Sequence, residues 1–208
     1  LTAAYHLARQ GHQVTVFESD PLPGGMLRHG MPSYRMPHEG LDRDIKNVTA
    51  LGVEIRCNTP AESISALKQQ GFDAIFVGVG NQVPRIIPLQ GRDLADVTDC
   101  MQFLRETKCE HLEMPDLAGR HVVVLGGGNV ALDVARSAVR LGTASTTILC
   151  LEDRERMPAH GWEVQEAEEE GVGLIPSASA KTLLTDESGQ PLLEYLAVGS
   201  IEFTPQGR

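Results

Sequence analysis

The chain has 208 residues, of which 41% are hydrophobic and 22% are charged, as in an ordinary globular protein. Its formal net charge of −10 would repel a phosphate backbone and argues against nucleic-acid binding. No apolar run approaches the roughly 18 residues of a membrane span, so we expect no membrane-spanning segment in this sequence. The four cysteines form no C-x-x-C pair, which predicts reduced thiols in the cytoplasm and no metal or iron–sulfur site within this stretch.

The first third of the chain predicts a helix, a strand and a long loop. The opening stretch, LTAAYHLARQGHQVTVFESD, predicts a helix without an N-terminal start signal. The helix stops at Gly11, and a strand that ends at Glu18 follows it. Residues 20–37 contain too many glycines and prolines for a helix or a strand and predict a loop. Residues 39–52 predict an amphipathic helix, because apolar residues recur at helical spacing. These residues are Leu41, Ile45, Val48 and Leu51.

The middle of the chain predicts three short elements and one buried strand. VEIRCN (53–58) is typical of a strand, and SISALKQQG (63–71) is typical of a short helix. FDAIFVGVGN (72–81) is almost continuously apolar, which indicates a strand buried on both faces of a parallel sheet. VTDCMQFLRETK (97–108) predicts a further helix.

Near Leu117 the same order of elements starts again. HVVVLGGGN predicts a strand running into a glycine loop, and VALDVARSAVRLG predicts a helix that stops at Gly142. TTILCLE predicts a strand ending at Glu152, and WEVQEAEEEG an acidic helix ending at Gly171. The stretches 173–185 and 192–204 look like sheet. Strands that alternate with helices imply an α/β fold with a parallel sheet.

The glycine loop is the most informative motif. Gly126, Gly128 and Ala131 fit G-x-G-x-x-A between a buried strand and a helix. The first glycine permits the tight turn, the second lets a pyrophosphate approach the backbone, and the alanine lets the helix pack on the strand. The unpaired N–H groups at the helix start attract phosphates. The motif therefore predicts dinucleotide binding; the alternative is a glycine-rich turn in a structural α/β unit.

Glu152 bears on the choice of nucleotide. A carboxylate at the tip of this strand accepts hydrogen bonds from the ribose hydroxyls, whereas a 2′-phosphate would meet like charge. Asp153 adds to that repulsion, although Arg154 and Arg156 could still reach a phosphate. We therefore expect NAD(H) to be favoured over NADP(H). The alternative is an exposed, charged turn.

The opening of the chain matches the second half of the same unit, namely a helix, a glycine stop, a strand and the terminal acid Glu18. We therefore expect a first G-x-G-x-x-G immediately before Leu1. On this interpretation the chain is a fragment that lacks its first phosphate loop.

Three stretches resemble the small, flavin-containing subunit of glutamate synthase and its relatives among FAD-dependent NAD(P)H oxidoreductases. They are PGGMLRHGMPSYRMP at 23–37, FDAIFVGVGNQVPRIIPLQG at 72–91, and VVVLGGGNVALDVARSAVRLG followed by RMPAHGWEVQEAEEEGV at 156–172. The resemblance implies two Rossmann-like dinucleotide-binding domains, the second inserted in the first and both truncated here. It places an FAD-binding domain at 1–98 and an NAD(P)-binding domain at 99–208.

The resemblance also implies a set of cofactor-binding residues. Glu18 would hold the FAD ribose, and Val79 and Gly80 would pass near the FAD pyrophosphate. Residues along the flavin would be Gly24, Gly25, Met26 and Leu27. Residues of the nicotinamide-nucleotide site would be Gly126, Gly127, Gly128, Asn129, Val130, Ala131, Glu152 and Arg154. Many members carry Arg-Arg where this chain has Leu151 and Glu152, which weakens NADPH as the cofactor.

The implied activity is hydride transfer between NAD(P)H and FAD, with electrons relayed to or from an iron–sulfur domain or partner. The cofactors carry this chemistry, so no catalytic acid or base is expected. The alternative is a non-catalytic NAD-binding regulatory or docking module. We expect His160 and Glu163 to lie in a solvated loop and helix start, and the alternative is that they line the nucleotide site. We expect an exposed helix face that contains Glu166, Glu168, Glu169 and Glu170, and the alternative is an acidic face that docks a basic electron carrier.

Overall fold

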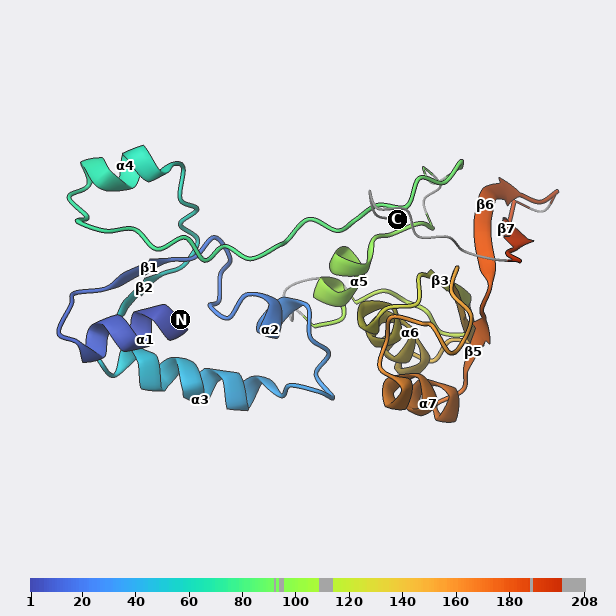
Figure 1. The fold of residues 1–208 in the computed structure, drawn as a ribbon, viewed down its shortest axis with the longest axis horizontal. Helices are drawn as coiled ribbons and strands as arrows, with labels where there is room; N and C mark the ends of the chain where they lie inside the picture. The colour runs from blue at the N-terminus through green and yellow to red at the C-terminus, as the bar shows by residue number, and fades with distance from the viewer. Residues whose placement is uncertain (92, 94–95, 109–113, 188, 200–208) are drawn as a thin grey trace. The chain divides into compact units, whose positions relative to one another are not determined.

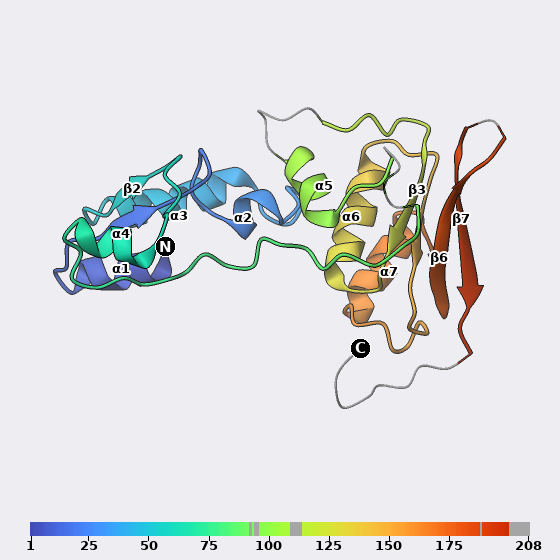
Figure 2. The ribbon, with the colours of Figure 1, turned by 90° about the horizontal axis from the view of Figure 1, so that it is seen from above.

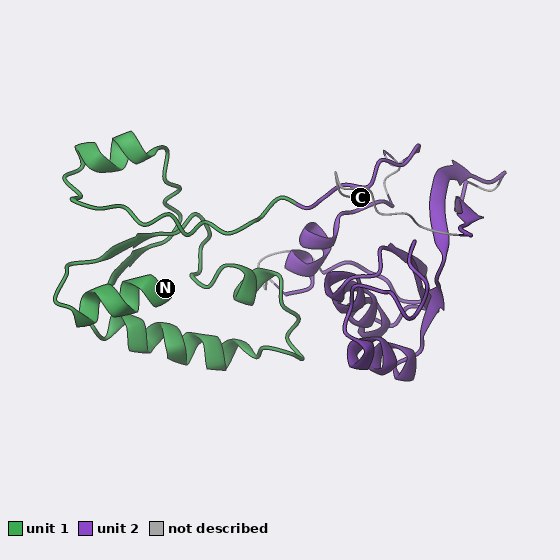
Figure 3. Cartoon of the chain, in the orientation of Figure 1, with its two compact units in different colours: residues 1–83 green, residues 84–208 purple. Residues whose placement is uncertain are grey.

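The computed structural model describes residues 1–208 except 92, 94–95, 109–113, 188 and 200–208. The chain forms two compact units, which divide between Val83 and Pro84 (Figure 3). Each unit has its own hydrophobic core and its own parallel strands, and each is described separately below.

Unit 1 contains a two-stranded parallel sheet. Strands β1 (Thr15–Phe17) and β2 (Glu54–Arg56) pair in parallel, with Val16 opposite Ile55. Helices α1 (Thr2–Arg9) and α3 (His38–Thr49) lie on one face, and α4 (Ile64–Gln69) lies on the other (Figure 1). The short helix α2 (Met26–His29) precedes α3. The core on the α1–α3 side is built on Ala4, Val48 and Val53.

Most of the predicted elements of unit 1 are confirmed. Three of the four apolar positions of α3 are buried, whereas Leu51 lies beyond the helix end and is exposed. The predicted loop at 20–37 contains one helical turn, α2, that the pattern did not reveal. The N-terminus of α4 is capped by Ser63, whose side-chain oxygen accepts the backbone N–H of Ala66 at 3.0 Å.

The buried strand predicted at 72–81 is wrong for this structure. The segment has no regular secondary structure, and the exposed fractions of Phe76 and Val79 are 74% and 73%. An apolar segment forms a strand only beside a neighbour that accepts and donates its backbone hydrogen bonds. In the described part of unit 1 the strands β1 and β2 pair with each other, and this segment pairs with neither.

Unit 2 contains a three-stranded parallel sheet in the order β3–β4–β5. The strands are β3 (His121–Leu125), β4 (Ser145–Leu149) and β5 (Val172–Ile175). Helix α6 (Asn129–Arg140) connects β3 to β4, and α7 (Gly161–Glu169) connects β4 to β5. Helix α5 (Cys100–Glu106) packs on α6. The predicted parallel α/β order of this half of the chain is confirmed.

A hydrophobic core joins these helices to the sheet. Leu132, Ala135 and Ala138 on α6 and Ile148 on β4 are fully buried. The antiparallel pair β6 (Ala178–Thr185) and β7 (Pro191–Ala197) lies on the side of the sheet away from the helices (Figure 2). The second stretch expected to form sheet continues to residue 204, and its residues 200–204 lie outside the described part. No helix of the described residues is long and apolar enough to span a membrane.

Candidate nucleotide-binding site

The glycine loop joins the end of β3 to the start of α6. Gly126 has φ +122°, a backbone conformation that side chains with a Cβ rarely adopt. Its N–H donates to the carbonyl of Leu149 at 2.9 Å, which ties the turn to the end of β4. The predicted role of Gly126 as the residue of the tight turn thus agrees with its geometry.

The next two glycines differ in their surroundings. A Cβ on Gly127 would lie 3.1 Å from the Cβ of Cys150 and 3.3 Å from its Sγ, so a side chain here would have to push the Cys150 side chain aside. A Cβ on Gly128 would meet nothing within 4 Å, and its φ of −90° is accessible to any residue. Because nothing inside the protein excludes a side chain at Gly128, the space beside it is open to a ligand.

Helix α6 begins directly at this open space. Gly128 is its N-cap residue and makes no side-chain capping hydrogen bond. The N–H groups of the first turn and the helix dipole therefore favour an anion. Ala131 is 9% exposed and belongs to the core, whereas Val130 is 47% exposed. This cradle fits the pyrophosphate of a dinucleotide.

Glu152 lies against the same loop. Strand β4 ends at Leu149, three residues earlier than predicted, and the chain then folds back so that Glu152 is only 6% exposed. Its Oε2 is 3.5 Å from the position that a Cβ on Gly127 would take. Its carbonyl accepts the N–H of Ser177 at 2.9 Å. The alternative of an exposed, charged turn is therefore wrong for Glu152 itself.

The cations near Glu152 are engaged by acids. Arg154 forms an ion pair with Glu168, and the hydrogen bond raises the pKa of Arg154. Arg156 lies 3.5 Å from Asp153, measured between Nε and Oδ2. Neither arginine is buried, so a 2′-phosphate would have to compete with these carboxylates for them.

The segment from Met157 to His160 packs on the glycine loop. The N–H of Ala159 donates to the carbonyl of Gly127, and the N–H of His160 donates to Oδ1 of Asn129, both at 3.1 Å. The His160 ring is stacked with Trp162, with centroids 6.2 Å apart and an interplanar angle of 7°. Sequence reasoning did not single out Trp162. The two backbone contacts join residues about thirty positions apart, and no local pattern reveals them.

The expectations for α7 are partly wrong. Glu163 is 4% exposed, because it lies on the face of α7 that packs into the unit. Arg136 on α6, also buried, donates to Glu166 at 2.7 Å and to Glu170 at 2.6 Å. Arg140 also donates to Glu170, which is only partly exposed. Burial raises the pKa of Glu170, but the hydrogen bonds from both arginines outweigh it and lower that pKa.

The first acid, Glu18, directly follows β1 in unit 1. Its N–H donates to the carbonyl of Arg56 at 2.9 Å and its carbonyl accepts the N–H of Thr59 at 2.8 Å, which extend the pairing of β1 with β2. Its Oε1 accepts the N–H of Asp20 at 3.0 Å. Glu18 is half-buried at the end of a parallel strand, a position suited to a ribose.

The loop after Glu18 is fixed by a buried cation, Arg28. A Cβ on Gly24 would lie 2.9 Å from Cδ2 of Leu41, and φ at Gly24 is +135°. The side chain of Arg28 is 6% exposed and donates to the carbonyl of Pro23 at 2.6 Å and to Asp42 at 2.5 Å. The hydrogen bond from Arg28 lowers the pKa of Asp42.

The predicted flavin-side residues sit on this fixed loop. Gly25 has φ +54° and precedes α2, and the side chains of Met26 and Leu27 are 36% and 41% exposed. Val79 and Gly80 lie apart from regular structure, in the exposed segment after α4.

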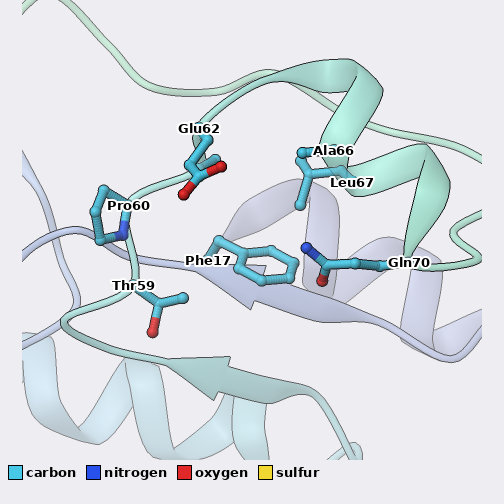
Figure 4. Close-up of a pocket in the computed structure, with 8 residues that line it drawn as sticks. Phe17, Thr59, Pro60, Glu62, Ala66, Leu67 and Gln70 are labelled. Carbon is cyan, nitrogen blue, oxygen red and sulfur yellow. The ribbon is translucent and has the colours of Figure 1, made fainter.

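A pocket of about 220 Å³ lies between β1 and α4 in unit 1 (Figure 4). Its lining residues are Phe17, Thr59, Pro60, Ala61, Glu62, Ala66, Leu67 and Gln70. None of the predicted cofactor-binding residues lines it, and its wall is formed largely by side chains that pack α4 on β1. We therefore assign no cofactor to it.

The described residues contain no group of three or more His, Cys, Asp or Glu side chains that could hold a metal ion. Cys57, Cys100 and Cys150 are free thiols, and burial raises the pKa of each. Cys109 lies outside the described residues.

Residues 1–198 match the family model described as pyridine nucleotide-disulphide oxidoreductase. The chain is 40% identical over 176 residues to the "NADP(+)-dependent formate dehydrogenase subunit beta" of Moorella thermoacetica, covering 83% of this chain and 25% of the relative. It is 37% identical over 198 residues to the "NADPH-Fe(3+) oxidoreductase subunit beta" of Geobacter sulfurreducens, covering 91% and 29%. It is 33% identical over 178 residues to the "NAD-dependent dihydropyrimidine dehydrogenase subunit PreT" of Escherichia coli, covering 84% and 42%.

The fold is also similar to a solved structure. The "His57Gln mutant" of FprA from Mycobacterium tuberculosis superimposes with a TM-score of 0.71 at 17% identity, covering 98% of this chain and 68% of that one. The predicted Rossmann-like fold class and the resemblance to FAD-dependent NAD(P)H oxidoreductases are confirmed. The chain spans less than half the length of the three relatives. It belongs to the pyridine nucleotide-disulphide oxidoreductase family.

Proposed function

We propose that the chain is the FAD- and pyridine-nucleotide-binding part of an oxidoreductase that passes hydride between the two cofactors. Electrons would be relayed to or from an iron–sulfur domain or partner. The observation that carries this proposal is the open space at Gly128, directly in front of the uncapped α6. The two cofactors supply the redox chemistry when bound, so the protein has to bind, orient and select them.

In this proposal the nucleotide pyrophosphate lies against the backbone from Gly126 to Val130. The N–H groups at the start of α6 donate to its oxygens, and the positive end of the helix dipole balances its charge. Asn129 holds the Met157–His160 segment in place through its Oδ1, which fixes one wall of the site.

We propose that NAD(H) is favoured over NADP(H). Glu152 is buried beside Gly127, where its carboxylate can accept hydrogen bonds from the ribose hydroxyls and would repel a 2′-phosphate. Arg154 is held by Glu168 and Arg156 lies beside Asp153. The names of the three relatives do not agree on this point, since two refer to NADP(H) and one to NAD.

We further propose that FAD is bound by the segment 1–98 and the nicotinamide nucleotide by 99–208. Glu18 would accept hydrogen bonds from the FAD ribose, and Gly24, Gly25, Met26 and Leu27 would line the flavin. Arg28 supports these roles because it fixes the loop that carries them. Val79 and Gly80 would lie near the FAD pyrophosphate. The proposed boundary differs from the division of the compact units at Val83 and Pro84.

Calorimetric titration with NAD⁺ and NADP⁺ tests the nucleotide site. In Gly128→Val the side chain fills the open space, so we expect at least tenfold weaker binding with the fold retained. The control is Gly40→Ala, whose added Cβ also meets nothing within 4 Å. Gly40 belongs to unit 1, whereas the nucleotide loop belongs to unit 2. Unchanged NAD⁺ affinity in Gly128→Val would place the nucleotide elsewhere and remove the basis of the proposal. Loss of the yellow flavin colour on adding NADH separates the enzyme from a binding module.

A further inference from the structure

We propose that the stacked pair His160–Trp162 forms a platform for the adenine ring of the bound pyridine nucleotide. This inference rests on the proposed function, because it assigns further residues to the same site. Trp162 is the only tryptophan in the sequence.

His160 is held at the phosphate cradle by two hydrogen bonds donated by backbone N–H groups. The N–H of His160 donates to Oδ1 of Asn129, the first residue of α6, and the preceding N–H of Ala159 donates to the carbonyl of Gly127. Both acceptors belong to the loop that would hold the pyrophosphate. The ring of Trp162 is in turn stacked on the His160 ring, 6.2 Å away between centroids. An aromatic surface therefore adjoins the predicted phosphate position.

Trp162 does not belong to the buried face of α7. The buried residues of α7 are Glu163, Val164 and Ala167, which lie on another face of the helix. Trp162 is 55% exposed, and it is absent from the hydrophobic core of the unit. A large aromatic side chain exposed beside a nucleotide site is suited to stack on a base, since bases and indole rings offer flat π-surfaces of similar size.

The adenine end of the nucleotide is favoured by the position of Glu152. Its Oε2 lies 3.5 Å from the Cβ position of Gly127, and the carbonyl of the same glycine accepts the N–H of Ala159. If Glu152 binds the adenosine ribose, the ring attached to that ribose lies close to the same residue. The His160–Trp162 pair is the aromatic surface attached there.

Three ligands separate the possibilities in calorimetric titrations of the protein. NAD⁺ contains both rings, AMP contains only adenine, and nicotinamide mononucleotide contains only nicotinamide. In Trp162→Leu we expect binding of NAD⁺ and AMP to weaken roughly fivefold or more, the scale of one base–aromatic stack. Trp162→Phe keeps a flat ring and should stay within about twofold. Tyr195→Leu removes an aromatic side chain of similar exposure on β7 and serves as the control.

Fluorescence of the single tryptophan gives a second readout. We expect AMP to change the emission of Trp162 with the same concentration dependence as the heat of binding. NAD⁺ binding that is unaltered in Trp162→Leu would overturn the platform and leave the proposed function standing. A loss confined to nicotinamide mononucleotide would overturn the adenine assignment. If the unaltered protein binds neither NAD⁺ nor NADP⁺, the proposed function fails and the platform with it.

Discussion

Gly127→Ala should destabilise unit 2, because the added Cβ meets the buried end of β4. It would lie 3.1 Å from the Cβ of Cys150, a residue that is only 2% exposed and packed in the core. Overpacking of this kind costs about 1–3 kcal/mol, and the reduced entropy of the unfolded chain returns about 0.4–1 kcal/mol. These ranges leave a net change between about 0 and 2.6 kcal/mol, and we expect a loss of about 1–2 kcal/mol because Cys150 is buried in the core.

The matched variant is Gly128→Ala, one residue along the same loop. Its Cβ meets nothing within 4 Å, and the small loss at a helix N-cap is offset by the same entropic gain, so stability should change by less than about 0.5 kcal/mol. Urea unfolding followed by Trp162 fluorescence reports on this unit, since Trp162 lies in α7. The reasoning would be refuted if Gly127→Ala were as stable as the unaltered protein, or if Gly128→Ala lost more free energy of unfolding than Gly127→Ala.

Two further changes test the charges of unit 2. Glu152→Arg should shift the ratio of NADH to NADPH dissociation constants toward NADPH by about tenfold, and an unchanged ratio would remove Glu152 from cofactor selection. Glu170→Gln should cost about 1–2 kcal/mol, since buried Arg136 loses a charged partner, whereas Glu169→Gln should change stability by less than about 0.5 kcal/mol. Because the pKa of Glu170 is lowered from 4.5, its contribution to stability is complete above pH 4.5 and is lost as the pH falls through the folded pKa. The urea midpoint of Glu170→Gln should therefore vary less with pH in the acid range than that of the unaltered protein. An equal pH dependence in the two proteins would contradict this.

The elements of unit 2 could be predicted because their signals are local. A strand, a glycine turn and an amphipathic helix follow one another within residues 121–142, and the side chains that decide each element lie within it. The strand was expected to be buried, but Val124 is its one buried residue and Val123 is 48% exposed. The same holds for α3, where the apolar spacing identified Leu41, Ile45 and Val48. The strand predicted at 72–81 is absent because strand pairing is not local. An apolar run can form a strand only beside another strand, and its own sequence does not determine whether that neighbour is present.

The candidate site shows the same limit. The motif identified Gly126, Gly128 and Ala131, but the constraint on Gly127 comes from Cys150, which is 23 positions away. The acidic run of α7 predicts a solvated face, yet Arg136 lies 30 residues before Glu166 and reaches it across two packed helices. Trp162 was overlooked because it is linked to the loop through His160, and the hydrogen bonds of Ala159 and His160 reach residues about thirty positions earlier in the chain.

Gly127, Cys150 and Glu152 lie close together, so cofactor selection and stability are coupled at this point of the fold. The Cβ position of Gly127 is 3.1 Å from the Cβ of Cys150 and 3.5 Å from Oε2 of Glu152. Replacing buried Glu152 will therefore disturb the packing of the glycine loop and also remove the negative charge beside it. Loss of loop order lowers the affinity for NADH and NADPH together, since both present the same pyrophosphate, whereas the charge at this position acts only on the 2′-substituent. The ratio of the two dissociation constants, measured beside the urea midpoint, separates these effects where either affinity alone cannot.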